Sequence, residues 1–196
     1  MKILILGGPK FLGYHLIETA LAGGHQVTTF NRGQTSPELF PEIEKLAGDR
    51  DGCLEALHGR KWDAVIDTSG YFPRLVGDSA RLLADAVERY IFISTISVYE
   101  DAQAPGMDET APLLKLADES VEDISGANYG GLKALCEQAV EEALPGRSLV
   151  IRPGLIVGPR DPSDRYTYWP VRVARGGEIL LPQGPEHPVQ VIDVRD

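Results

Sequence analysis

Short apolar runs alternate with longer segments of helical periodicity along the chain. Ile3 to Leu6 form a continuous run of branched side chains, which is typical of a strand buried on both faces. From Phe11 to Leu21, apolar residues recur every three or four positions, which predicts a helix, and Gly23 and Gly24 end it before a second apolar run at Val27 to Phe30. The amino-terminal segment therefore predicts a unit of strand, helix and strand.

The same alternation continues through the rest of the chain. Further strands are predicted at residues 64 to 66, in YIFISTISVY and in LVIRPGLIV. Helical spacing in RLVGDSARLLADAVERY predicts a helix that includes Ala86 and Val87, and YGGLKALCEQAVEEAL predicts another. Strands and helices that alternate over short connections imply the α/β class, with a doubly wound parallel sheet covered by helices on both faces. Ligands of such sheets bind at the carboxyl ends of the strands.

The stretch GGPKFLG connects the first predicted strand to the first helix. The amino end of a helix presents unpaired backbone amides and a positive dipole, and glycines let a diphosphate approach the backbone. Gly7 and Gly13 occupy the outer positions of the spacing Gly-x-x-Gly-x-x-Gly, with an extra Gly8, but Lys10 stands at the middle position. We expect the Lys10 side chain to point away from the phosphates, toward the adenosine ribose or the solvent. The alternative is a turn that serves only strand-to-helix packing.

Polar residues follow the second predicted strand and a short segment after it. Dinucleotide sites that prefer NAD usually carry an acid at the end of the second strand, for the ribose hydroxyls. This chain has Asn31 and Arg32 there, and an arginine suits a ribose phosphate, so together with Lys10 it favours NADP over NAD. An ordinary solvated arginine is the alternative. Asp49 in AGDRD is placed to accept a hydrogen bond from an adenine amino group, although a plain turn residue would look the same.

Two stretches carry candidate chemistry. Tyr129 and Lys133 are four residues apart on a predicted helix, so both project from one face. An ammonium beside a phenol favours the phenolate and so lowers the tyrosine pKa toward the range useful for proton transfer. Ser94, Thr95 and Ser97 place hydroxyls at the end of the preceding strand, where a substrate oxygen would lie in this kind of fold.

Composition and charge narrow the functional classes. A length of 196 residues suffices for one sizeable core and a small appendage. The 19 basic and 29 acidic residues give a formal net charge of -10, which opposes nonspecific binding to nucleic acid or an anionic membrane. No apolar stretch suits a signal peptide or a membrane span, and Cys53 and Cys136 lack metal-type spacing, so we expect a cytoplasmic chain with reduced thiols. We predict no metal site, because the histidines are scattered. They are His15, His25, His58 and His187.

Taken together, these segments resemble a known family. GGPKFLG, the hydroxyls followed by Val98 and Tyr99, the pair of Tyr129 and Lys133, and RPGLIVGP at 152 to 159 look like the extended short-chain dehydrogenase/reductases, the NAD-dependent epimerase/dehydratase group. The motifs occur in the family's order and at its distances over nearly the whole chain. The glycine turn with a basic middle residue resembles that of the isoflavone-reductase-like and chloroplast stem-loop-binding-like members.

The resemblance implies roles at single positions. Counting back from Tyr99, the family's active hydroxyl falls on Thr95, which would hydrogen-bond the reacting oxygen of the substrate. Tyr129 would be the general acid/base for that oxygen, while Lys133 would lower its pKa and bond the nicotinamide ribose. Ser97 would lie beside the substrate. The implied dinucleotide contacts are Gly7, Gly8 and Gly13 with the intervening Lys10, Phe11 and Leu12 at the diphosphate, Asn31 and Arg32 at the ribose, Asp49 at the adenine, Thr68, Ser69, Gly70 and Ser94 at strand ends, and Pro153, Gly154 and Leu155 beside the nicotinamide.

The chain departs from the family pattern in two respects. The family's sugar-nucleotide dehydratases follow the active threonine with an acidic pair, whereas Ile96 and Ser97 follow Thr95, which disfavours dehydration. Family members also continue past VQVIDVRD, so we expect a carboxy-terminally truncated chain. The predicted domains are a dinucleotide-binding domain at 1–153 and the start of an incomplete substrate lobe at 154–196.

The stretch PRDPSDRYTYWPVRVARGG concentrates arginines and aromatic residues in an acidic protein. Guanidinium groups suit phosphates and aromatic rings stack on bases, so the stretch suits a nucleotide-linked substrate, with Arg160 and Tyr168 as candidate contacts, or single-stranded RNA. The alternative is a partly buried helix whose arginines reach water and whose aromatic rings fill the seam between lobes.

The sequence thus predicts an NAD(P)-dependent epimerase or reductase, an oxidoreductase or isomerase that acts on a hydroxyl or carbonyl group. Its substrate would be a small molecule such as a nucleotide-linked sugar, with no membrane partner. The resemblance also predicts a homodimer through the helices that carry Tyr129 and Leu82. The alternative is a non-catalytic dinucleotide-binding protein with an RNA-binding or redox-sensing role, which the intact set of Thr95, Tyr129 and Lys133 and the net charge of -10 disfavour.

Overall fold

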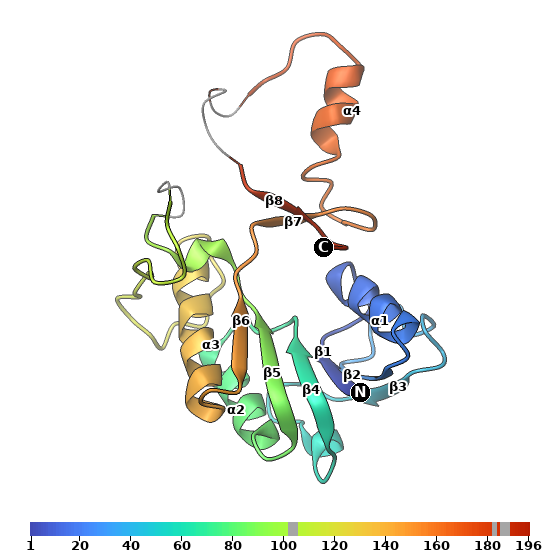
Figure 1. Ribbon diagram of the computed structural model, residues 1–196. Helices are drawn as coiled ribbons and strands as arrows, with labels where there is room; N and C mark the ends of the chain where they lie inside the picture. Colours follow the sequence, from blue (N-terminus) through green and yellow to red (C-terminus); the bar gives the residue numbers. More distant parts are fainter. Residues whose placement is uncertain (102–105, 182–183, 185–188) are drawn as a thin grey trace.

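A six-stranded parallel sheet forms the body of the protein (Figure 1). The computed structural model describes residues 1–101, 106–181, 184 and 189–196. The strand order is β3-β2-β1-β4-β5-β6, which confirms the predicted doubly wound sheet. The strands are β1 Lys2–Leu6, β2 Gln26–Asn31, β3 Glu44–Ala47, β4 Trp62–Asp67, β5 Val87–Ile93 and β6 Ser148–Ile151.

Helices cover both faces of this sheet. Helix α1, Leu12–Ala22, packs Ile17 and Ala20 against Ile3 and Ile5 of β1. Helices α2, Pro73–Leu83, and α3, Tyr129–Ala143, contact each other on the opposite face, over a larger core that includes Leu4, Tyr90 and Phe92. The 3-10 turns η1, Glu55–Leu57, and η2, Ile96–Val98, follow β3 and β5. Among the described residues, no helix has the length and apolarity needed to cross a membrane.

The second predicted helix is shorter than expected. The prediction that it includes Ala86 and Val87 is wrong, because α2 ends at Leu83 and Val87 begins β5. Val87 pairs with Trp62 in the parallel ladder and is buried there. Its spacing fits the helical period by coincidence, since a buried strand of this kind also begins with an apolar residue.

A second, smaller group of elements lies beyond the carboxyl edge of the sheet (Figure 1). Strands β7, Leu155–Val157, and β8, Val191–Asp193, form a parallel pair, so the final segment VQVIDVRD does contain a strand. Helix α4, Tyr168–Ala174, has no buried residue, which disagrees with the alternative that its aromatic rings fill a seam. His15 of α1 contacts this group, with Nε2 lying 3.0 Å from the Pro159 carbonyl oxygen.

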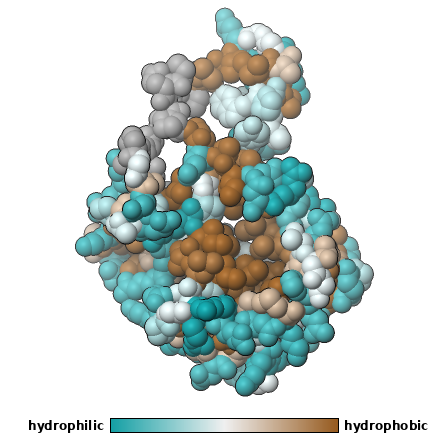
Figure 2. Space-filling model, in the orientation of Figure 1, coloured by the Kyte–Doolittle hydropathy of each residue, from teal (hydrophilic) through white to brown (hydrophobic). Residues whose placement is uncertain are grey.

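One face of the sheet remains open near its edge. Figure 2 shows apolar surface gathered on the side that faces the viewer in both figures. On the edge strand β6, Leu149 and Ile151 are 56% and 42% exposed. These side chains mark a part of the sheet that α1 does not cover.

A buried ion pair supports the carboxyl end of β4. Asp67 is fully buried, and its two carboxylate oxygens accept hydrogen bonds from Arg50, with Nη1 to Oδ1 at 2.8 Å. The Tyr90 hydroxyl donates to the same carboxylate at 2.8 Å, and Arg50 Nη2 donates to the Ser79 hydroxyl at 2.6 Å. Burial opposes ionisation of Asp67, but the Arg50 charge and the hydrogen bonds from Arg50, Tyr90 and the Ser69 amide together outweigh it and lower the carboxyl pKa. The network therefore joins the segment after β3 to β4, β5 and α2.

Breaking this pair tests its structural weight. We expect Arg50→Met to lower the free energy of unfolding by about 3–5 kcal/mol, because it leaves the Asp67 charge buried without a partner. The double variant Arg50→Met/Asp67→Asn removes that charge and keeps an acceptor for Tyr90, so it regains at least half of the loss. Urea unfolding measures both values. If the free energy of unfolding of Arg50→Met lies within about 1 kcal/mol of the wild-type value, the ion pair contributes little to stability.

Candidate functional site

Two cavities open at the carboxyl ends of the parallel strands and share Tyr71 in their linings. The larger, of about 810 Å³, lies between the ends of β4 and β5, the start of α3 and the β7/β8 pair. The smaller, of about 340 Å³, lies at the ends of β1, β2 and β3. Together they form the crevice expected for a ligand of a doubly wound sheet.

The glycine turn after β1 leaves no room for a side chain at Gly7 or Gly13. Gly7 has φ of 142°, and a Cβ on it would stand 2.2 Å from the Thr68 hydroxyl oxygen. A Cβ on Gly13 would stand 2.1 Å from the Gly8 carbonyl oxygen. Asn31 braces the turn, because its Nδ2 donates to the Gly7 carbonyl at 3.1 Å. This close packing suits both a bound diphosphate and the alternative of a purely structural turn.

The smaller cavity brings together most of the residues predicted to hold adenosine. Gly7, Gly8, Asn31, Arg32 and Asp49 line it, together with Ser69. Lys10 is exposed and absent from the described linings of both cavities. Sequence reasoning missed Arg50, whose guanidinium lines this cavity while it is bound to Asp67. The signal was available, because an acid at the end of the apolar run WDAVID needs a buried partner.

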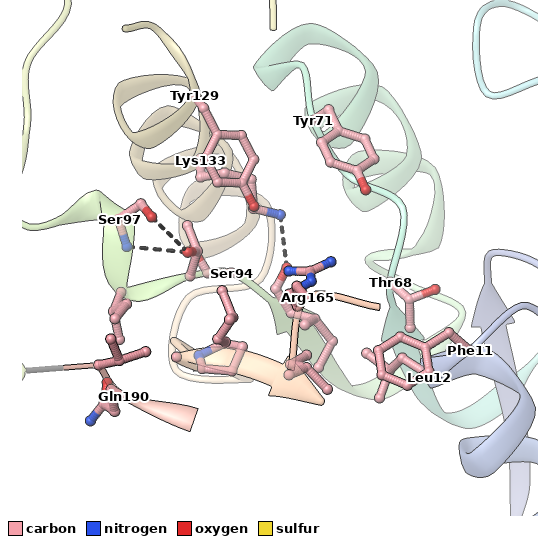
Figure 3. A pocket seen from close by; sticks show the side chains of 18 of the residues that line it. Phe11, Leu12, Thr68, Tyr71, Ser94, Ser97, Tyr129, Lys133, Arg165 and Gln190 are labelled. Atoms are coloured by element: carbon pink, nitrogen blue, oxygen red, sulfur yellow. Dashed lines mark hydrogen bonds between the residues drawn. The ribbon is translucent and has the colours of Figure 1, made fainter. Parts of the chain in front are cut away.

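Lys133 lies at the floor of the larger cavity, between the ends of two strands (Figure 3). Its Nζ donates to the carbonyl oxygens of Gly70 and Ile93, each at 2.7 Å. The ammonium also lies over the Phe92 ring, 4.1 Å from the centroid. The side chain has no carboxylate hydrogen-bonded to it in the described residues, and burial lowers the Lys133 pKa to about 8.

The predicted catalytic hydroxyls meet in the same cavity. Tyr129, Thr95, Ser97 and Lys133 all line it. Thr95 Oγ1 accepts a hydrogen bond from the Ser97 backbone amide at 3.1 Å and lies 3.2 Å from the Ser97 hydroxyl. Thr95 is buried, so the surrounding residues hold its hydroxyl in one position.

The Tyr129 pKa is raised in the structure, whereas the sequence predicted that Lys133 lowers it. Burial raises the Tyr129 pKa, and the neighbouring Tyr71 phenol raises it further. The hydrogen bond with Thr95 and the positive charge of Arg165 lower it, without reversing the shift. The Lys133 ammonium instead binds two backbone carbonyls, so in this structure its main contact is with the strand ends.

The larger cavity also contains a polar atom that suits a bound ligand. Ser94 Oγ is buried and has no hydrogen-bond partner among the described residues, which is costly unless a ligand supplies one. Phe11, Leu12, Thr68, Pro153, Gly154 and Leu155 line the same cavity. This orphaned hydroxyl and the tight glycine turn fit a bound dinucleotide.

The aromatic and basic stretch contributes one residue to the described lining of the larger cavity. Arg160 lies over the Tyr14 ring of α1, 3.8 Å from the centroid, and Tyr168 on α4 is 52% exposed. Neither of these two predicted substrate contacts is in the described lining of the cavity, whereas Ser97, the third, is. Arg165 lines it instead, although it lacked an individual role in the sequence-based prediction.

The described residues include no group of three or more His, Cys, Asp or Glu side chains that could hold a metal ion. His15, His25 and His58 lie apart, and His187 falls outside the described residues. Cys53 is exposed and Cys136 is buried, and both are free thiols.

Curated relatives cover most of the chain. The chloroplast stem-loop binding protein of 41 kDa b from Arabidopsis thaliana is 30% identical over 158 residues, which is 67% of this chain and 41% of the relative. The 2-alkyl-3-oxoalkanoate reductase of Stenotrophomonas maltophilia is 31% identical over 181 residues, 82% of this chain and 52% of the relative. The chain therefore spans about half the length of these relatives or less. No protein-family model matches it.

Solved structures share the fold at low sequence identity. The Bordetella bronchiseptica enzyme WbmH in complex with NAD+ matches with a TM-score of 0.76 and 18% identity, over 99% of this chain and 68% of that one. The human epimerase family protein SDR39U1 with NADPH matches with a TM-score of 0.67 and 21% identity, over 100% of this chain and 67% of that one. At these identities the similarity establishes the architecture alone.

The lowered pKa of Lys133 predicts a pH-dependent penalty on folding. The unfolded chain holds this proton up to about pH 10.4, whereas the folded chain releases it near pH 8. Between these values the unfolded state binds more protons, so wild-type stability rises with pH relative to Lys133→Met. Measured by urea unfolding, the free energy of unfolding of the wild type minus that of Lys133→Met should grow by about 2 kcal/mol from pH 7.5 to 9.5. Lys115→Met, at an exposed position, is the control. If the difference in free energy of unfolding between the wild type and Lys133→Met does not change with pH, the lowered pKa of Lys133 is contradicted.

Proposed function

We infer that this chain, which belongs to the NAD-dependent epimerase/dehydratase group of the extended short-chain dehydrogenase/reductases, binds a nicotinamide dinucleotide. We also infer that it serves oxidation, reduction or epimerisation at a hydroxyl or carbonyl carbon. The observation that carries this proposal is the meeting of Tyr129, Thr95 and Lys133 in one cavity at the strand ends. The adjoining cavity with its glycine turn gives the dinucleotide a place to lie.

The proposed chemistry needs a proton transferred to or from one substrate oxygen. Tyr129 is the proposed general acid/base, and Thr95 is the hydroxyl that would hold the same oxygen. Both side chains line the larger cavity, which supports a shared target. A bound nicotinamide would supply or accept a hydride at the substrate carbon. Lys133 would keep α3 at the strand ends and offer its ammonium to the nicotinamide ribose.

NADP is the proposed preference over NAD. Arg32 lines the smaller cavity and is exposed, so its guanidinium is free to meet a ribose phosphate. Lys10 lies outside the described linings, and it would contribute only by moving toward the ribose edge. One structural neighbour was solved with NAD+ and another with NADPH, which supports a nicotinamide dinucleotide without separating the two.

The substrate of this proposal is a small molecule, with a nucleotide-linked sugar as one candidate. A solved structural neighbour holds UDP-glucose together with NAD, which supports that class for the fold. Ile96 and Ser97 follow Thr95 where the family's dehydratases carry an acidic pair, so the proposed reactions exclude that dehydration. A homodimer through α2 and α3 stays a prediction.

Calorimetric titration with NADP and with NAD tests the dinucleotide proposal. We expect NADP to bind more tightly, and Arg32→Ala to weaken NADP by about tenfold while NAD is unchanged, because only NADP has the ribose phosphate. Lys10→Gly should erode the same preference if its ammonium reaches the ribose. Gly13→Ala should abolish binding of both, because its Cβ would collide with the Gly8 carbonyl. Absence of binding by the wild type would end the enzyme interpretation of this chain.

Stem-loop binding is a second candidate, supported by the name of the Arabidopsis relative. The exposed rings of Tyr166 and Tyr168 beside several arginines suit a single strand, whereas the net charge of -10 opposes it. Filter binding of a structured RNA at two salt concentrations separates the candidates. We expect weak binding at both concentrations, while tight and salt-sensitive binding would favour the RNA role.

A further inference from the structure

The described lining of the larger cavity carries two cations in a protein whose formal net charge is -10. Its described lining includes the cations Lys133 and Arg165 and contains no Asp or Glu. Lys133 is already engaged by the carbonyl oxygens of Gly70 and Ile93. Arg165 is therefore the cation of the described lining that is available to a ligand.

The local turn holds Arg165 by one nitrogen. Its Nε donates to the Ser163 hydroxyl at 2.6 Å and lies 3.8 Å from Asp161 Oδ2. Asp161 in turn accepts from the Ser163 backbone amide at 2.9 Å, which fixes the turn. Within the described parts of the chain, the two terminal nitrogens of Arg165 have no hydrogen-bond partner. A planar guanidinium with both terminal nitrogens open matches the paired oxygens of a carboxylate or a phosphate.

This guanidinium faces the reacting groups. Figure 3 shows Arg165 directed toward the side of the cavity where Tyr129 and Lys133 project from α3. Its charge is close enough to lower the Tyr129 pKa. The side chain is 45% exposed, which places it at the mouth of the cavity rather than on its floor. A substrate oxygen at Tyr129 and Thr95 would thus have Arg165 beside it on the open side.

We propose that Arg165 is a specificity-determining residue that selects substrates with an anionic group next to the reacting carbonyl or hydroxyl carbon. The proposal rests on the proposed function of the same cavity and names its substrate class. The anionic group would lie against the two terminal nitrogens of Arg165, while the reacting oxygen lies at Tyr129 and Thr95. A neutral analogue of the same shape would leave the guanidinium without a partner and so bind more weakly.

Ligand-observed NMR titration at pH 7 tests this selection without any dinucleotide. The probes are acetoacetate and its neutral methyl ester, added to the wild type, Arg165→Gln and the control Arg81→Gln. Arg81 lies on the surface of α2, so its variant makes the same charge change far from the cavity. We expect the wild type and Arg81→Gln to bind acetoacetate roughly tenfold more tightly than the ester, and Arg165→Gln to lose that preference.

A second readout separates a direct role from a structural one. The phenol of Tyr129 can be titrated from the difference in absorbance between each protein and its Tyr129→Phe counterpart. Arg165→Gln should raise the Tyr129 pKa, because a neighbouring positive charge is lost, and Arg165→Lys should restore it in large part. A merely structural role would leave the Lys variant no closer to the wild type than the Gln variant.

The contrary outcomes are distinct. Equal binding of the two probes by the wild type, or a preference that survives Arg165→Gln, would overturn the proposal. A loss of NADP affinity in Arg165→Gln with the acetoacetate preference intact would assign Arg165 to the cofactor diphosphate and also overturn it. Failure of NADP to bind any variant would refute the proposed function alone, because the probe preference is measured without the dinucleotide.

Discussion

The buried ammonium of Lys133 fixes the geometry on which the candidate site depends. It ties α3 to the carboxyl ends of β4 and β5 through two carbonyl oxygens, and the Phe92 ring covers it. Burying a charge without a carboxylate costs stability, which the hydrogen bonds and the aromatic ring offset only in part. Tyr129 lies one helical turn before Lys133, so the same contact sets the direction of the phenol into the cavity.

Two further ion pairs stabilise the elements around the site. The Arg50 and Asp67 pair closes the end of β4, next to Thr68 and Ser69. On the other side of the site, Arg152 binds Glu137 of α3 at 2.7 Å and donates to the Tyr99 hydroxyl at 2.9 Å. These pairs leave the cavity walls little freedom, as a site built on strand and helix termini requires. The hydroxyls of Thr95 and Ser94 therefore lie on a rigid support.

Local patterns predicted the fold and which candidate site residues lie together at one edge of the sheet. The apolar strands, the glycine turn and the spacing of Tyr129 and Lys133 follow from short-range constraints, and residues that end parallel strands meet at one edge. The features that differ from the sequence-based expectations depend on three-dimensional geometry, which the spacing of residues along the chain does not determine. Val87 fits a helix by spacing but belongs to a strand. Arg160, Arg165 and Tyr168 share one segment, and only the path of its turn decides that Arg165 lines the cavity. The Tyr129 pKa likewise depends on burial, which outweighs the neighbouring charges.

We propose that one dinucleotide runs through both cavities, past Tyr71, with its nicotinamide ribose at Lys133. A crystal structure of the protein with NADP is the first measurement to make. We predict adenosine in the cavity lined by Arg32 and Asp49, diphosphate at the glycine turn, and ribose hydroxyls within hydrogen-bond distance of Lys133 Nζ. A dinucleotide bound elsewhere, or one whose nicotinamide half lies away from Lys133 and Tyr129, would contradict it.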